Sequence, residues 1–573
     1  MPLTSHSSWE CHQGHAVWSG TGFPARDVGS GERFPRTGKP APRSPDPSRT
    51  DYATFAGWKT LPGYIVVIAA ACLYNVMGAA DAARPLPAGS LIVNEDNSHF
   101  FGSRPPEQMT RAGLEAWVDG YAGTKVTHLF LCPNSMRASF RSRTREAIWD
   151  PVHGREPTGL WPQNAQRLHT AGLDPYAIWI ARARARGLSP WLSMRMNDVH
   201  SIDEPDSFMH SDFWRTHPEL RRVPGGPMQP WTNHALNYAH AAVRTHQRAF
   251  LEELLERYDP DGLELDWMRF GFHLTPGRER EEAPLLDAFV RDARALVDAW
   301  ARRRGHAIQL GVRVPAHPDA AAGLGLDAVR WAAAGWIDLI VPCPFWRTTD
   351  FDIPVELWRE RLGPVLARTA VVPGVEHNQR AWLTGTTVPN DLASLRGFAA
   401  AAQHRGAESM YLFNWMDSQT RPVSADDYAT LLREGLMLPA LAGKPRRHPI
   451  TYRDTTPPGF PDGTQLPVEA AKGGTFRVYV GEPDRAAAAT VILGLADRPG
   501  AAGSGLAVTL NGTRLTPVAD HPEPAKLGGA ARGLAFRVPP AALRPGYNEI
   551  SARQLDRGPG QQIVWVEVRF DAR

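Results

Sequence analysis

The chain has 573 residues, which is more than one hydrophobic core usually holds, so two folded parts are expected. Its formal net charge is +3 with histidines neutral, which disfavours a nucleic-acid partner because such proteins rely on a strong basic field. Four cysteines without metal-ligand spacing indicate neither a disulfide framework nor a zinc site. We therefore expect no cofactor and no structural metal.

The N-terminal segments do not have the pattern of a folded domain. Residues 1–60 are rich in Gly, Pro, Ser and Arg without an apolar period, which predicts disorder or a start site assigned too far upstream. Residues 61–83 carry a short apolar run followed by small residues, the pattern of a secretory signal. We expect an exported protein, periplasmic or extracellular, that is not inserted in a membrane once the signal is removed. The alternative for this run is a membrane anchor.

Eight short apolar runs then alternate with helical patterns over residues 90–440. Helical periodicity is expected over 174–186, 238–258, 285–304, 326–334 and 391–404. Eight strands alternating with helices predict an α/β fold, a (β/α)8 TIM barrel. An open doubly wound sheet is the alternative, although its GxGxxG loop is missing after the first run. The strands are expected at 91–94, 128–132, 190–195, 262–266, 309–313, 338–341, 370–375 and 409–414.

Residues 445–573 change to a strand-and-turn pattern. Strands are expected at 475–480, 490–495, 507–510, 534–538, 548–552 and 563–570, with Asn511-Gly512 as a hairpin turn. Strands at this spacing predict a C-terminal all-β sandwich domain. The stretches 508–515 and 543–550 resemble galactose-binding-like sandwich modules that accompany glycosidases.

Two acidic side chains mark the end of the fourth strand. In the motif 259–269, Glu264 and Asp266 share one face of the strand, and Leu263 and Leu265 share the other. Acids at the carboxyl end of a barrel strand lie where barrel active sites form. Both are candidate catalytic residues, Asp266 first because it is nearest the strand end. The alternative is a structural acid paired with Arg195 or Arg313.

A third acid ends the seventh strand. Glu376 follows this strand directly and precedes His377. Glycoside hydrolysis needs two carboxyl groups that flank the scissile bond, one protonated and one ionised. Strands four and seven face each other across a barrel mouth, so Glu376 is the expected partner of Asp266. Substrate binding without chemistry is the alternative for Glu376.

Polar and aromatic residues at other strand ends are candidate substrate ligands, because they supply directional hydrogen bonds or flat apolar faces for sugars. A long loop of this kind follows the third strand up to residue 237, and we expect it to act as a lid or a subsite wall. Its acidic and histidine side chains offer a weaker alternative, a metal site. The candidate ligands are Arg195, Asn197, Asp198, His200, Trp231, Arg313, Trp346, His377, Asn414 and Trp415.

These motifs together resemble the glycosyl hydrolase family 10-like barrels of exported bacterial proteins. The resemblance covers roughly residues 90–440 and rests on the stretches 256–267, 195–198 and 411–415. It implies a (β/α)8 barrel that acts on O-glycosidic bonds. Family members vary at the position of Glu264, so Asp266 carries over better.

The leading hypothesis is a glycosidase with a carbohydrate substrate and a two-carboxylate mechanism. In a retaining scheme Asp266 would be the acid/base and Glu376 the nucleophile, or the reverse. A non-catalytic glycan-binding protein on a degenerate barrel is the first alternative. A metal-dependent hydrolase of another bond is the second. The sequence does not indicate an oligomeric state.

Overall fold

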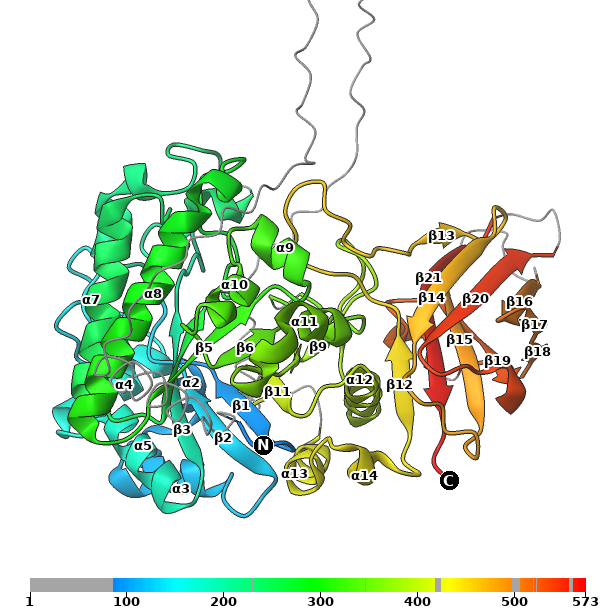
Figure 1. Ribbon diagram of the computed structural model, residues 1–573, viewed down its shortest axis with the longest axis horizontal. Coiled ribbons are helices and arrows are strands. Elements are labelled where there is room, and N and C mark those ends of the chain that lie inside the picture. The colour runs from blue at the N-terminus through cyan, green and yellow to red at the C-terminus, as the bar shows by residue number, and fades with distance from the viewer. Residues whose placement is uncertain are drawn as a thin grey trace, which may run out of the picture. The chain divides into compact units, whose positions relative to one another are not determined.

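The computed structural model describes residues 86–228, 230–345, 347–417, 424–496, 505–518, 520–521, 523–555 and 560–573, which belong to one compact unit. The expected N-terminal extension (1–60), the signal-like segment (61–83) and Trp346 lie outside the described residues. Figure 1 shows that the described chain begins with an α/β part and ends with an all-β part.

The α/β part is built on one parallel sheet, and each of the eight predicted segments contains a strand of it. The seventh segment forms two short strands instead of one. The hydrogen-bonded order is β7-β6-β5-β4-β3-β2-β1-β11-β8. The bounds are β1 Leu91–Glu95, β2 Val126–Leu131, β3 Ser189–Arg195, β4 Gly262–Asp266, β5 Gln309–Val314, β6 Leu339–Pro342, β7 Ala370–Val371, β8 Gly374–Val375 and β11 Met410–Phe413.

Residues 370–375 contact both ends of this sheet. β7 pairs with β6 at one end, and β8 pairs with β11 at the other. Between them, Val372 N–H donates to Ile340 O at 2.9 Å, and Pro373 O accepts from Tyr411 N–H at 3.2 Å. A proline has no N–H to donate, which explains why the segment is divided at Pro373.

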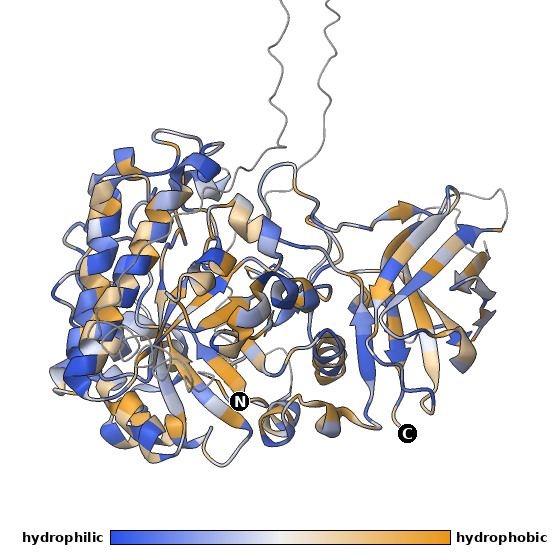
Figure 2. Ribbon diagram, in the orientation of Figure 1, coloured by the Kyte–Doolittle hydropathy of each residue, from blue (hydrophilic) through white to orange (hydrophobic). Residues whose placement is uncertain are grey.

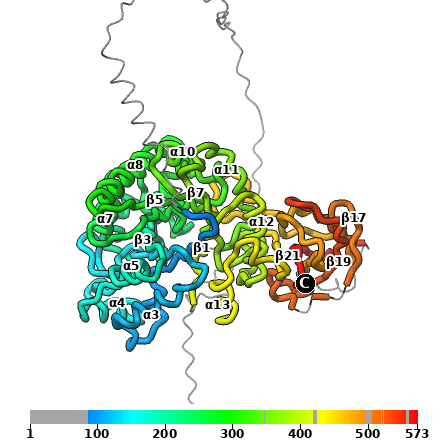
Figure 3. The backbone as a smooth tube through the Cα atoms, turned by 60° about the horizontal axis from the view of Figure 1, so that its bottom comes forward, coloured from blue at the N-terminus to red at the C-terminus, as the bar shows by residue number. Residues whose placement is uncertain are grey.

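Helices surround the strands on their outer side (Figures 1 and 3). The five predicted helices are present as α5, α7, α8, α10 and α12. Local signals set their ends: the Asp174 side chain accepts from the first turn of α5, and Gly305 ends α8 at φ +77°. The bounds are α2 His99–Ser103, α3 Arg111–Asp119, α4 Leu160–Thr170, α5 Pro175–Ala185, α6 Asp212–Thr216, α7 Ala241–Arg257, α8 Glu279–Arg304, α9 Pro318–Gly323, α10 Ala328–Ala333, α11 Val355–Leu362, α12 Leu392–His404, α13 Ala425–Glu434 and α14 Leu438–Leu441.

The strands separate two apolar layers. Leu263 and Leu265 of β4 belong to the large cluster shared with the helices, as their alternation predicts. On the other face, Trp191 stacks on Phe130 with ring centroids 4.6 Å apart. A Cβ atom at Gly262 would lie 2.3 Å from the Trp191 ring, so only glycine fits beside this indole. Figure 2 shows the apolar character of the central strands.

The all-β part contains two antiparallel sheets over one apolar cluster, consistent with a sandwich. Asn511 and Gly512 have positive φ angles of +50° and +81° and form the predicted turn between β16 and β17. The sequence did not predict β12, β13, β17 and β18. The bounds are β12 Arg446–Pro449, β13 Val468–Glu469, β14 Gly474–Tyr479, β15 Ala489–Ala496, β16 Leu506–Leu510, β17 Thr513–Arg514, β18 Thr516–Pro517, β19 Arg532–Val538, β20 Tyr547–Gln554 and β21 Gln562–Phe570.

Two smaller features complete the description. β9 (Asn378–Gln379) and β10 (Val388–Pro389) form a short antiparallel pair in the loop before α12. In the part of the chain that the structure describes, each helix is too short or too polar to cross a membrane.

Candidate active site

The carboxyl edge of the parallel sheet holds an Asp–Arg pair on two neighbouring strands. Asp266 ends β4, and Arg313 lies beside it in β5. The Arg313 guanidinium donates from Nε to Oδ1 at 2.8 Å and from Nη2 to Oδ2 at 3.0 Å. Both residues are buried, with exposed fractions of 2% for Asp266 and 0% for Arg313. This bidentate geometry stabilises the ionised carboxylate.

Two backbone amides add to the support of Asp266. The N–H groups of Met268 and Arg269 donate to Oδ1 at 3.1 and 3.0 Å. Oδ1 therefore accepts three hydrogen bonds and Oδ2 accepts one. The remaining acceptor position on Oδ2 is the part of the carboxylate that is not committed to the protein.

Glu264 lies two residues deeper in the same strand. Its Oε1 accepts from the Ser193 hydroxyl at 2.6 Å and the Tyr411 hydroxyl at 3.0 Å, and Oε2 is buried without a partner among the described residues. Burial, and then the negative charge of Asp266, raise the pKa of Glu264 well above its usual range. Glu264 is thus a neutral hydrogen-bonding acid beneath the Asp–Arg pair.

A second charged cluster joins the ends of β1 and β3. Arg195 binds Asp198 at 2.9 Å and also contacts the carboxylate of Asp96. Asp198 Oδ1 accepts from the Nδ1 of His200 at 2.8 Å. Burial lowers the pKa of His200, so its neutral ring donates through Nδ1 and accepts through Nε2.

The third predicted acid lies at the end of β8. Glu376 is fully buried, and its Oε2 accepts only a long hydrogen bond, 3.4 Å, from Asn414 Nδ2. Its Oε1 forms a close ion pair with Nδ1 of His377, although the two groups are not aligned as a hydrogen bond. The backbone of Glu376 is fixed more firmly, because its carbonyl accepts from Asn390 Nδ2 at 2.7 Å and Thr349 Oγ1 at 2.8 Å. The backbone is therefore fixed by two hydrogen bonds, and the carboxyl group has Asn414 and His377 as its polar neighbours.

Phe413, at the end of β11, connects these groups. The Arg313 guanidinium lies 3.7 Å from its ring centroid, and the Arg269 guanidinium lies 5.6 Å from it. The next residue, Asn414, has a left-handed backbone with φ +59° and holds Glu376. Backbone strain of this kind at a strand end is typical of functional sites.

Aromatic side chains form a wall beside the charged groups. The Trp231 ring packs on Phe270 at 5.2 Å and on Phe345 at 5.3 Å, and Phe270 contacts the edge of His200 at 4.8 Å. The chain segment between the two parts of the protein supports this wall. Asp454 of that segment accepts from the backbone N–H of Phe345 at 3.0 Å.

Two predicted ligands have other surroundings, and a third is not among the described residues. The amide of Asn197 exchanges two 2.9 Å hydrogen bonds with the backbone of Leu236, so it fixes the long loop after β3. Trp415 is fully buried in the large apolar cluster. Trp346 lies outside the described residues.

Sequence reasoning missed several residues of the site. Arg269 lay inside the motif after β4, so its position alone offered a signal. Ser193 and Tyr411 looked like ordinary strand residues, and only the structure places their hydroxyl groups on Glu264. No local signal marks Asp454, because its partner Phe345 is 109 residues away.

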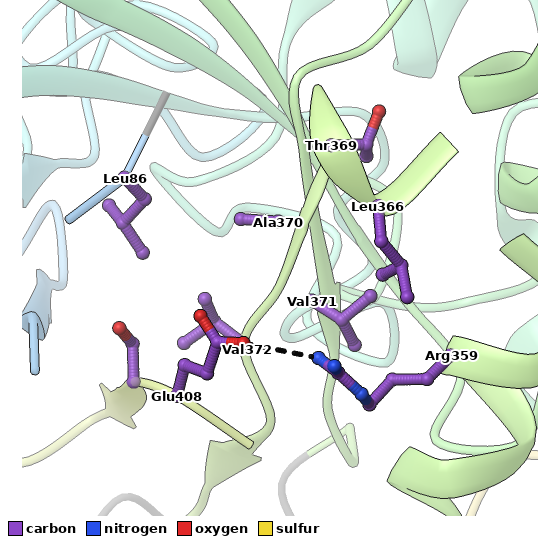
Figure 4. Close-up of a pocket in the computed structure, with 9 residues that line it drawn as sticks. Leu86, Arg359, Leu366, Thr369, Ala370, Val371, Val372 and Glu408 are labelled. Atoms are coloured by element: carbon purple, nitrogen blue, oxygen red, sulfur yellow. Dashed lines mark ion pairs between the residues drawn. The ribbon is translucent and has the colours of Figure 1, made fainter. Parts of the chain in front are cut away.

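The cavity in Figure 4 lies elsewhere, at the amino edge of the sheet. It is small, about 20 Å³, and its lining includes Leu86, Ala370 and Ser409, which precede or begin strands. An ion pair between Arg359 and Glu408, 3.5 Å apart, lies at its side. None of the predicted site residues lines it. Within the described residues, no group of three or more His, Cys, Asp or Glu side chains could hold a metal ion.

No protein-family model matches the chain, and no curated protein matches its sequence. Among solved structures, a cycloisomaltooligosaccharide glucanotransferase from Paenibacillus sp. aligns at 11% identity and a TM-score of 0.33, over 85% of this chain and 58% of that one. The PgaB (BpsB) glycoside hydrolase domain from Bordetella bronchiseptica aligns at 13% identity and a TM-score of 0.35, over 61% and 99%. The GH36 α-galactosidase AgaB from Geobacillus stearothermophilus aligns at 13% and 0.31, over 81% and 55%. These scores are too low to carry an argument about fold or function.

Proposed function

We propose that the chain is a glycoside hydrolase that cleaves O-glycosidic bonds of a poly- or oligosaccharide. In this proposal residues 370–375 close the parallel sheet into a (β/α)8 barrel, because they pair with both of its ends. The carboxyl edge is then the barrel mouth, where the active sites of such barrels lie. We further propose export of the protein and a galactose-binding-like C-terminal sandwich.

The contrast between Asp266 and Glu376 carries the proposal. Both carboxyl groups are buried at the ends of strands. Two consecutive residues link them: the Phe413 ring packs on Arg313, the partner of Asp266, and the Asn414 amide donates to Glu376. Asp266 is bound by the Arg313 guanidinium and two amides, whereas the described partners of the Glu376 carboxyl group are Asn414, through one long hydrogen bond, and the His377 ring. Glycoside hydrolysis uses two carboxyl groups in such unlike environments, one to carry charge and one to carry a proton.

These environments favour one distribution of roles. Asp266 would act as the carboxylate, since the Arg313 guanidinium binds both of its oxygens. Glu376 would donate a proton to the glycosidic oxygen as the bond to the anomeric carbon breaks. In a retaining reaction Oδ2 of Asp266 forms the bond to that carbon, and water deprotonated by Glu376 then releases the sugar. In an inverting reaction Asp266 deprotonates the attacking water instead.

The remaining residues have supporting roles in this mechanism. Neutral Glu264 hydrogen-bonds within the barrel without adding a second negative charge beneath Asp266. Trp231, the partly exposed member of the aromatic wall, offers a flat apolar ring for a sugar, and the buried Phe270 and Phe345 support it. Arg195, Asp198 and His200 provide polar groups at its edge.

The test is hydrolysis of a panel of plant, algal and bacterial polysaccharides by the full chain, beside Asp266→Asn and Glu376→Gln. We expect the parent to release reducing sugar and each variant to lose the rate by about three orders of magnitude or more. Glu567→Gln is the matched control, because Glu567 is an equally buried, Arg-paired acid in β21 of the all-β part. Equal losses in all three variants would point to folding and count against the proposal.

One observation favours a second candidate, a non-catalytic glycan-binding protein. Asp266, Glu264 and Glu376 are each at most 2% exposed, which leaves them less open to a substrate than a catalytic pair requires. A chain that binds a glycan without cutting it, and that binds equally well as Asp266→Asn, would support this candidate over the enzyme.

A further inference from the structure

Arg269 is a buried cation that the proposed mechanism does not use. It lies three residues after β4, and only its backbone N–H takes part in holding Asp266. Its side chain is 9% exposed and extends between the Arg195–Asp198 cluster and the Phe413 ring. The chain therefore places a third guanidinium at the mouth beside those of Arg195 and Arg313.

The bonding of this guanidinium is incomplete. Arg313 has the bidentate carboxylate of Asp266, and Arg195 contacts the carboxylates of both Asp96 and Asp198. The Arg269 group is 3.7 Å from Asp96, which already binds Arg195, and 3.3 Å from the neutral ring of His200. Its Nε–H is buried with no hydrogen-bond partner among the described residues. A buried donor without a partner is costly, so a ligand that accepts from it is favoured.

The charge around Arg269 points the same way. Burial and the nearby Arg195 lower its pKa, because the local field disfavours its positive charge. An arriving anion relieves that repulsion and completes the set of hydrogen bonds. A guanidinium binds a carboxylate through two parallel N–H donors, which gives this contact both strength and orientation.

We propose that Arg269 is a specificity-determining residue that binds a carboxylate on the saccharide, so the substrate class is an acidic, uronate-containing glycan. This inference rests on the proposed function and narrows it. The aromatic wall lies directly beside the cation: Phe270 follows Arg269 in the chain and packs on His200 and Trp231. One sugar ring can thus stack on the wall while its carboxylate meets Arg269.

The experiment compares oligogalacturonate and glucuronate-containing oligosaccharides with their methyl esters, which keep the skeleton and lose the charge. We expect the parent to prefer the free acid of one such pair by about 10- to 100-fold in kcat/KM. Arg269→Met should abolish that preference by lowering the rate on the acid and sparing the ester. Arg269→Lys, which keeps the charge without the planar fork, should retain part of it.

Arg446→Met is the matched control, since Arg446 is similarly buried over the Phe570 ring in the all-β part. It should leave the preference unchanged. If the parent cuts a glycan but Arg269→Met slows acid and ester equally, the anion site is wrong and the glycosidase stands. If no glycan is cut, calorimetric binding of the same acids decides: binding lost in Arg269→Met supports the anion site, and absent binding overturns it.

Discussion

Arg313 and Asp266 form a bidentate pair across two adjacent parallel strands, in the register that places Asp266 opposite Arg313. The pair is desolvated on all sides, so each partner depends on the other for its charge. This dependence links the stability of the sheet to the chemistry at its carboxyl edge.

Arg313→Met should therefore destabilise the protein strongly. It leaves the Asp266 carboxylate buried with backbone donors alone, at an expected cost of about 3–5 kcal/mol in the free energy of unfolding. This loss of unfolding free energy is measured by urea titration, with circular dichroism as the signal of unfolding. Adding Asp266→Asn should recover much of the loss. A double variant that loses the sum of the two single effects would show that the residues do not interact.

Glu264→Gln should be tolerated, and its benefit should grow with pH. The folded pKa of Glu264 lies above its ordinary value of 4.5, so the unfolded chain releases this proton first and folding loses stability as pH rises above that value. The amide cannot ionise and still accepts from Ser193 and Tyr411. The difference in unfolding free energy between variant and parent, measured by urea titration from about pH 4 to 8, should increasingly favour the variant. A pH-independent difference would contradict the neutral state of Glu264.

The stabilisation that His99 gives the protein should also fall as pH rises, in a higher pH window than for Glu264. Although burial opposes its charge, contacts with Glu95 and Asp417 raise the pKa of His99 to about 9 from 6.5. The contribution of His99 to the free energy of unfolding is complete below pH 6.5 and is lost as pH rises through 9. His99→Gln should cost up to about 3 kcal/mol at about pH 6 and progressively less toward about pH 9. Thermal unfolding across that range is the measurement, and a constant cost would refute the charged state.

Asp454→Ala should weaken substrate binding, although Asp454 follows the α/β part in the sequence. The variant removes the acceptor of the Phe345 and Arg347 amides and frees the loop that carries one side of the aromatic wall. We expect KM to rise by about 10-fold with a smaller change in kcat, together with a cost of about 1–3 kcal/mol in stability. Asp462→Ala, which removes only an exposed contact to Thr464 in the same segment, is the control. Similar KM values in both variants would exclude a positioning role.

The periodicity of the sequence was enough to locate the parallel strands, because buried β-strands between amphipathic helices leave a repeating pattern. Alternation along β4 also separated Glu264 and Asp266 from Leu263 and Leu265, as the two apolar layers confirm. Residue type and strand position suggested Arg313 as a partner for an acid, and it binds Asp266.

The rest depends on contacts that sequence distance conceals. The position of Asn197 at a strand end suggested a sugar ligand. In the structure its side-chain amide instead makes two hydrogen bonds with the backbone of Leu236. Trp415 likewise lies in the core, where tertiary packing rather than strand position decides its environment. β12 was not predicted because Arg446–Pro449 carries no apolar alternation and is stabilised by pairing with β21.

The pairing of β1 with β11 has a consequence for synthesis of the protein. Leu91 is aligned with Met410, so β1 has no neighbour on that side until more than three hundred further residues have been made. Its edge would stay open during this interval, and an unpaired edge is a site for aggregation. Such distant pairing also slows folding. Production of this chain should accordingly benefit from slow translation or a chaperone that shields β1, and fragments that end before residue 410 should be insoluble.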